Sequence, residues 1–354
     1  MDVMSPELMW IGTRCYRINQ VSEQSYLQQQ PDENKPYVEE DLYEEDDREA
    51  DYEIQICEGG KFQTSFHVPS VFFAMIIGSK GTTRRRLETE TKTQIVVPRQ
   101  GTEGDITVKG ASRKTVTACR QRIELIVLGA RSRQQFTHFL SIPLSSNEIR
   151  TNYVKFREKI LTELPVGFGM DESLFQNADK LHMTLFTMSL MDNEDRSQAA
   201  LLLQECRETV IDPILANYGS IEIRIRGLEY MNDDPHAVDV LYAKVESEAL
   251  QQIADELMQR FVSSGLVQKK YDRVKLHVTL INSLFRDGGS GAMAGGGGEE
   301  EPRSNARVTF DATTILREFG HYDFGAQKVS DIHLSQRYST ACDGYYEATG
   351  QIKL

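Results

Sequence analysis

Two copies of a short pattern, histidine–apolar–threonine–apolar, lie 95 positions apart in this 354-residue chain. They read His182-Met183-Thr184-Leu185 and His277-Val278-Thr279-Leu280. Each follows a leucine and lies in an apolar run that is typical of a buried strand. Because side chains alternate along a strand, each histidine shares a face with its threonine. If the two strands are neighbours, the imidazoles and hydroxyls can supply the acid, base and hydrogen-bond donors for metal-free phosphodiester cleavage.

The elements before the two motifs match. A strand is expected at 136–144 and an amphipathic helix at 148–164 before the first motif, and again at 238–246 and 248–264 before the second. A duplicated α+β unit of this kind would place the motifs about a pseudo-twofold axis, facing each other across a cleft. A single motif would more often be a core histidine, and the repetition argues against that alternative.

These motifs carry a family resemblance. The paired patterns resemble those of the two-histidine (2H) phosphoesterase superfamily. The segments FTHFLSIPL, GLEYMNDDP, KLHVTLIN and FDATTILREFG are similar to its eukaryotic branch, which is related to the nuclear-localisation domain of A-kinase anchor protein 7. The resemblance covers most of residues 134–354. It implies a bilobal α+β domain that hydrolyses cyclic phosphates or RNA-terminal phosphodiesters without metal, with His182, Thr184, His277 and Thr279 as catalytic residues.

A second signature lies before this domain. The pattern predicts a strand near 62–69, a short apolar element at 71–77, the Gly78-Ser79-Lys80-Gly81 interruption and a helix at 82–93. Strands at 94–98 and 105–110 and a closing helix at 112–128 follow. This order, and IIGSKGTTRRRLETETKTQIVVP in particular, resembles a type I KH domain (β-α-α-β-β-α).

The glycine-flanked loop has a direct chemical interpretation. Two glycines allow the backbone to approach a sugar–phosphate chain closely, and the next helix presents unpaired N–H groups at its start. Positive side chains add charge for phosphates, as KH domains do when they clamp about four nucleotides. The candidate RNA-binding residues are Gly78, Ser79, Lys80, Gly81, Arg84 and Arg85. The alternative is a KH fold used for protein docking.

Charge is distributed unevenly. The net charge is −13, yet residues 32–53 alone carry −10, whereas residues 76–133 carry +8. One acidic segment therefore conceals a basic domain that is suited to nucleic acid. The five cysteines are scattered and contain no CxxC pair, which favours reduced thiols and argues against a zinc site. No apolar run is long enough for a membrane span.

The expected organisation is an acidic, largely disordered tail at 1–53, a KH domain at 54–132 and a 2H phosphoesterase domain at 134–354. A flexible glycine-rich loop is expected at 287–307. Weaker pocket candidates surround the two motifs: His138, Tyr230, Asn232 and Asn282. For His138 a structural role is the favoured alternative. No cofactor or metal is expected.

The combination of both domains behind an acidic tail resembles a family of nuclear subunits. That resemblance implies a transcription-coactivator and alkylation-damage-response complex containing a large helicase subunit, within which this chain is one monomer. Two functions stay open. One is an RNA-binding phosphodiesterase that acts on RNA ends or cyclic nucleotide phosphates, with single-stranded DNA as an alternative ligand. The other is a non-catalytic RNA- or nucleotide-binding adaptor.

Overall fold

The chain divides into two units in the computed structural model, Met1–Asp51 and Tyr52–Leu354. In the first unit, β1 (Leu8–Ile11) pairs antiparallel with β2 (Arg14–Arg17). The structure describes residues 8–11, 14–17, 52–57, 59–99, 102, 104–164, 169–286 and 308–354. Most of the predicted acidic tail and the predicted glycine-rich loop at 287–307 lie outside these ranges.

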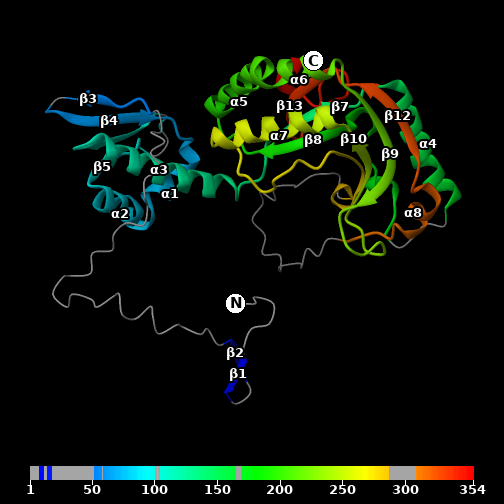
Figure 1. Ribbon diagram of the computed structural model, residues 1–354, viewed down its shortest axis with the longest axis horizontal. Helices are drawn as coiled ribbons and strands as arrows, with labels where there is room; N and C mark the ends of the chain where they lie inside the picture. Colours follow the sequence, from blue (N-terminus) through cyan, green and yellow to red (C-terminus); the bar gives the residue numbers. More distant parts are fainter. Residues whose placement is uncertain are drawn as a thin grey trace, which may run out of the picture. The chain divides into compact units, whose positions relative to one another are not determined.

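The second unit begins with a KH fold (Figure 1). Within the described residues its antiparallel sheet has the strand order β3-β4-β6-β5, and three helices pack against it and against one another. The elements are β3 (Gln55–Cys57), β4 (Lys61–Phe66), α1 (Phe73–Ile77), α2 (Thr82–Thr91), β5 (Thr93–Val96), β6 (Ile106–Gly110) and α3 (Arg113–Arg131). From β4 onward they follow the predicted order, and β3 is an additional edge strand.

Alternating residues build the KH core. Ile106 and Val108 of β6 point inward, and Val116 and Ile123 of α3 cover them, all fully buried. Helix α3 begins at a capping box, in which the Ser112 hydroxyl accepts the Thr115 N–H. Such a cap stabilises a helix by about 1 kcal/mol. The capped helix therefore has one defined start against the sheet.

The rest of the unit is built on one large antiparallel sheet. In the described part of the chain it has eight strands in the order β12-β9-β10-β11-β8-β7-β13-β14. The strands are β7 (His138–Pro143), β8 (His182–Met188), β9 (Glu222–Tyr230), β10 (Val240–Glu246), β11 (His277–Asn282), β12 (Asp323–Lys328), β13 (Asp331–Gln336) and β14 (Ala348–Lys353). The helices are α4 (Asn147–Glu163), α5 (Asn193–Cys206), α6 (Asp212–Tyr218), α7 (Glu248–Ser263) and α8 (Thr313–Phe319).

The predicted duplication is visible in this order. β7-α4-β8 and β10-α7-β11 are the two strand–helix–strand units, and their last strands, β8 and β11, lie side by side at the centre of the sheet (Figure 1). Outward from that centre, β7 corresponds to β10, β13 to β9 and β14 to β12. Helix α4 packs near β12, α5 near β14 and α7 near β8. The domain is thus two halves that meet where the histidine motifs lie.

Several elements, among them β9, β12 and α5, were not anticipated from the sequence. Strands β9 and β12 extend one half of the sheet, and α5 covers β14 in the other half. Helix α5 buries Ala199, Leu203 and Cys206, whose spacing places them on one helical face. The first turn of the helix is polar, so the apolar periodicity is too short to predict the helix from the sequence. Among the described residues, every helix is too short or too polar to span a bilayer.

The two domains contact each other through buried and charged groups. Met191, which precedes α5, packs against the KH core. Nearby, the His67 imidazole of the KH domain lies 2.9 Å from the Asp192 carboxylate, which caps α5 by accepting the Asp195 N–H. These contacts attach the start of α5 to the KH domain.

Candidate active site and nucleic-acid interface

The predicted pairing of the two motif strands is confirmed. β8 and β11 run antiparallel, with Met183 opposite Val278. Both of these side chains are buried in the core, at 0% and 1% exposure. The alternating partners His182, Thr184 and His277 are therefore on the opposite face of the sheet, and each is partly exposed. Thr279 is likewise partly exposed.

The two imidazoles are held in the same way. His182 Nδ1 lies 2.7 Å from the Lys180 carbonyl oxygen, and His277 Nδ1 lies 2.7 Å from the Lys275 carbonyl oxygen. A carbonyl only accepts hydrogen bonds, so Nδ1 carries the proton in both neutral rings. Each Nε2 is then an available base, and His182 Nε2 accepts the Thr184 hydroxyl at 3.1 Å. Backbone geometry thus fixes both tautomers.

Aromatic rings surround the first histidine. The ring of Phe139 on β7 lies 5.1 Å from the His182 ring, and that of Tyr346 lies 5.4 Å away, edge to face. Tyr345 is buried next to them and hydrogen-bonds Ser141 at 3.0 Å. Burial raises the pKa of both tyrosines. Both phenols are therefore neutral at pH 7, and their hydroxyl groups can form hydrogen bonds at the site.

The second histidine has a simpler version of the same surroundings. The Tyr242 ring on β10 lies 5.2 Å from the His277 ring, edge to face. The ammonium of Lys275 lies 4.6 Å from the centre of the Tyr242 ring, just as that of Lys180 lies 4.8 Å from the centre of the Tyr346 ring. Each half thus contributes a lysine, an aromatic ring and a histidine. The sequence signal for this arrangement is the Lys-Leu-His triplet that begins both motifs.

Burial lowers the pKa of both catalytic candidates. For His182 it lowers the pKa to about 4, opposed by the Lys180 carbonyl bond and assisted by the nearby His277. For His277 burial is again the largest cause, opposed by the Lys275 carbonyl bond and assisted by the Lys275 ammonium. Both rings are therefore neutral at pH 7 in the unliganded protein.

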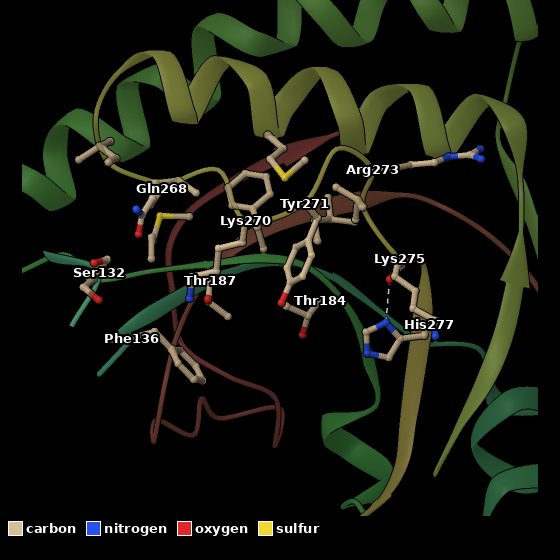
Figure 2. A pocket seen from close by; sticks show the side chains of 18 of the residues that line it. Ser132, Phe136, Thr184, Thr187, Gln268, Lys270, Tyr271, Arg273, Lys275 and His277 are labelled. Atoms are coloured by element: carbon tan, nitrogen blue, oxygen red, sulfur yellow. Dashed lines mark hydrogen bonds between the residues drawn. The ribbon is translucent and has the colours of Figure 1, made fainter. Parts of the chain in front are cut away.

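A cavity of about 740 Å³ opens beside His277 and Thr184, whereas His182 and Thr279 are not among its lining residues (Figure 2). It extends from His277 and Thr184 along β8 to the end of α3 in the KH domain. Tyr230 and Asn232, predicted as pocket residues, line it. Other lining residues include Ser132, Phe136, Thr187, Gln268, Lys270, Tyr271, Arg273 and Lys275. Its volume is within the range of about 300–1,000 Å³ that small-molecule sites occupy.

The other two pocket candidates lie elsewhere. His138 is 2% exposed, on the core side of β7 with Leu140 and Ile142, and Nε2 is 3.1 Å from the Thr349 hydroxyl. Burial lowers its pKa to about 4. Asn282 accepts the Leu284 N–H at the turn that follows β11 and does not line the cavity.

The predicted RNA-binding loop has the geometry of a tight turn. Gly78 has φ 72°, and a Cβ there would lie 2.3 Å from the Thr83 hydroxyl, so only glycine fits. Ser79 and Lys80 are exposed at the tip, and α2 begins at Thr82 directly after Gly81. The backbone N–H groups of that helix start are available to an anion.

The two arginines of the loop have different roles. Arg85 donates to the Lys80 carbonyl at 2.6 Å, which braces the loop from within. Arg84 lies 3.8 Å from the Glu88 carboxylate, one helical turn later. The charge most freely presented to a phosphate is therefore Lys80, while Arg85 helps to hold the loop backbone in place.

Comparison with known proteins decides the family. The chain is 34% identical to activating signal cointegrator 1 complex subunit 1 of Mus musculus, over 99% of both sequences. It belongs to that family. Within this chain, residues 63–125 match the KH domain, and residues 136–354 match the AKAP7 2'5' RNA ligase-like domain.

Two solved structures similar to this cointegrator-subunit family member each cover 62% of its chain. TT0787 of Thermus thermophilus is 16% identical, with 97% of its own chain covered and a TM-score of 0.36. LigT of E. coli, solved as a complex with NADP+, is 15% identical, with 99% of its own chain covered and a TM-score of 0.36.

Proposed function

We propose that this protein is an RNA-binding, metal-independent phosphodiesterase whose substrate is an RNA end or a cyclic nucleotide phosphate. The observation that carries the proposal is the shared arrangement of His182 and His277. Both imidazoles are locked as Nδ1–H tautomers by a backbone carbonyl, and both lie on neighbouring strands with a threonine two residues away. Acid–base chemistry on a phosphodiester needs such a pair.

The proposed reaction moves two protons. Neutral His182 takes a proton through Nε2 from the attacking water, whose oxygen forms the new bond to phosphorus. Protonated His277 gives a proton to the leaving oxygen as its bond to phosphorus breaks. Thr184 and Thr279 donate hydrogen bonds to the phosphoryl oxygens, where charge accumulates in the five-coordinate transition state. Proton exchange with solvent then restores both histidines: protonated His182 releases its proton and neutral His277 takes one up.

The phosphate itself supplies the required protonation state. Both rings are neutral at pH 7 without ligand, because burial lowers the pKa of each. An anionic phosphodiester beside an imidazole favours its charged form and so raises its pKa. His277 lines the cavity and is the ring whose protonation by solvent a bound phosphate favours in this way.

The low pKa values also favour the second candidate, a binding adaptor without turnover. If the bound phosphate does not raise the pKa of His277 sufficiently, the site lacks its acid at neutral pH. It would then hold a nucleotide end by hydrogen bonds alone. The phosphodiesterase and the adaptor would therefore both bind a nucleotide end, and only the phosphodiesterase would hydrolyse it.

The KH domain would hold the RNA. Single-stranded RNA, or single-stranded DNA, would contact the Gly78–Gly81 loop and the start of α2. The name of the mouse relative further suggests a subunit of a cointegrator complex. From the family resemblance we expect that complex to be nuclear and to contain a large helicase subunit. The chain would be one copy within that hetero-complex, in transcription coactivation and the response to alkylation.

The deciding experiment assays purified protein on nucleoside 2′,3′-cyclic phosphates and on RNA with cyclic or monophosphate 3′ ends, with nucleotide binding measured in parallel. Wild type, His182→Ala and His277→Ala are compared with His321→Ala, a control at an exposed histidine outside the cavity lining. Turnover lost in the two motif variants and kept in the control supports the enzyme. Binding with no turnover in any protein supports the adaptor.

A further inference from the structure

The segment between α7 and β11, residues 264–276, forms one wall of the cavity, and its tip has no role in the proton transfers above. We call it the α7–β11 loop. Its two ends are fixed, because Val267 and Val274 are buried at 6% and 5% exposure. The Val274 N–H also donates to the Asp255 carboxylate at 2.7 Å, and its carbonyl accepts from Gln251 at 2.8 Å. The residues between Val267 and Val274, which form the tip of the loop, are therefore held in a defined position.

The tip of this loop projects two side chains into the cavity. Figure 2 shows Lys270 and Tyr271 extending from the loop toward the β8 side of the cavity, where Thr184 and Thr187 lie. Tyr271 is 69% exposed and contacts no other aromatic ring among the described residues. An exposed ring over a large cavity beside a phosphoryl site is a surface on which a nucleobase can stack.

Lys270 complements that ring. It forms no ion pair with any residue that the structure describes, whereas the neighbouring Lys269 is paired with Asp272 at 2.8 Å. A lysine without a carboxylate partner is available to pair with a phosphate oxygen. A base-stacking ring and a free ammonium on adjacent residues are the two groups that a nucleotide needs.

The floor of the cavity is shaped by an irregularity in β8. The register between β7 and β8 shifts where Leu140 faces Phe186 and Ser141 faces Thr184, so Leu185 is the extra residue. Both Leu185 and Phe186 are in the core. Because of the bulge, Thr187 faces the cavity, as Thr184 does. The polar surface of the cavity therefore extends along β8 beyond Thr184.

We propose that the α7–β11 loop binds a second nucleotide, with Tyr271 stacked on its base and Lys270 on its phosphate. This inference rests on the proposed function and specifies its substrate: an RNA end of at least two nucleotides, in preference to a cyclic mononucleotide. The second nucleotide occupies the side of the cavity that extends along β8, away from His277.

The test compares a cyclic mononucleotide with a dinucleotide that ends in the same 2′,3′-cyclic phosphate. Affinity is measured by calorimetry on the full chain, so that the result does not depend on turnover, and kcat/KM is measured where turnover occurs. Wild type should bind the dinucleotide at least tenfold more tightly. Removing one base-stacking ring typically weakens binding roughly 5- to 150-fold.

The variants separate the two contacts. Tyr271→Ala should abolish the dinucleotide preference and leave mononucleotide affinity unchanged, whereas Tyr271→Phe should keep the preference. Lys270→Ala should weaken dinucleotide binding and reduce its salt dependence, and the matched control Lys269→Ala should do neither. Thermal unfolding of each variant should match wild type, because both side chains are exposed.

Equal affinity of wild type for the two ligands, or an intact preference in Tyr271→Ala, overturns the inference. Absence of turnover on both ligands together with a dinucleotide preference that depends on Tyr271 overturns the proposed hydrolysis and upholds the second-nucleotide site. The two proposals therefore fail separately.

Discussion

Arg131, at the end of the last KH helix, and Asp195, in the first turn of α5, form a buried bidentate ion pair across the two domains. Nη1 and Nη2 donate to the two carboxylate oxygens at 2.6 and 2.9 Å, and the side chains are 8% and 3% exposed. Nη1 also donates to the Ser189 carbonyl, and the same carboxylate accepts the Met191 N–H at 2.8 Å. This ion pair and its two backbone hydrogen bonds therefore connect the last KH helix to the start of α5.

Breaking this pair should destabilise the protein strongly. Arg131→Ala leaves a buried carboxylate without its partner, which typically costs about 3–5 kcal/mol. Denaturant unfolding should show this loss, whereas Arg224→Ala, in the exposed Arg224–Asp323 pair, should change the stability little. The double variant Arg131→Met/Asp195→Leu should be more stable than Arg131→Ala. Similar stabilities for Arg131→Ala and Arg224→Ala would contradict the structural role.

Each motif histidine should matter to catalysis. His182→Ala or His277→Ala should reduce kcat by roughly 10²–10⁴-fold, because each removes an acid or a base. The double variant should lose far less than the product of the two effects, because the pair acts as a unit. Activity should persist in EDTA. Loss of activity on chelation would refute the metal-free mechanism.

The pH profile follows from the lowered pKa values. In the free protein the base must be neutral and the acid protonated, so kcat/KM should be bell-shaped. Burial lowers the pKa of His182 to about 4 and lowers the pKa of His277 as well, hence the maximum should lie at acidic pH and the rate should fall toward neutral pH. An optimum well above pH 7 would show that these two rings are not the groups that titrate.

Stability should depend on the buried histidine of β7. His138 has a folded-state pKa of about 4, below its ordinary value of 6.5, so its contribution is fully present above pH 6.5 and is lost as pH falls toward 4. His182 adds to the same loss. Melting temperature should therefore decrease between those values. His138→Gln should show a shallower decrease, and an unchanged pH dependence in that variant would exclude His138 as a cause.

RNA binding should depend on the glycine-flanked loop. Replacing Ser79 and Lys80 by aspartate places negative charge against the sugar–phosphate backbone and should weaken single-stranded RNA binding roughly tenfold or more. Binding should also fall with rising salt. Lys155→Asp, an exposed residue of α4, is the charge-changing control for fluorescence-anisotropy titrations. Equal affinity of loop variant and wild type would place the RNA site elsewhere.

Periodic, buried elements were predictable from the sequence, and long-range contacts were not. The apolar spacing of α4 and α7 and the alternation of the motif strands each follow from one segment of chain. The same alternation could have placed His138 on the core face, because Leu140 and Ile142 share it. Tyr345 and Tyr346 join the site from more than 160 positions after His182, and no local pattern indicates that.

The bulge in β8 is a second case of this kind. Strict alternation from His182 and Thr184 puts Thr187 on the core face, yet one extra residue moves it to the cavity. A bulge is set by packing on both faces of a sheet, and the sequence of one strand does not reveal it. The α7–β11 loop is polar and aperiodic, so its sequence does not indicate that Tyr271 lines the cavity.

The late position of Tyr345 and Tyr346 has a genetic consequence. A nonsense codon or frameshift between the codons for Gln336 and Tyr345 would spare both histidine motifs and the KH domain. It would nevertheless delete the rings packed around His182 and the edge strand β14 that α5 covers. Such an allele should therefore behave as a loss-of-function allele, although its product retains every motif by which the protein is recognised.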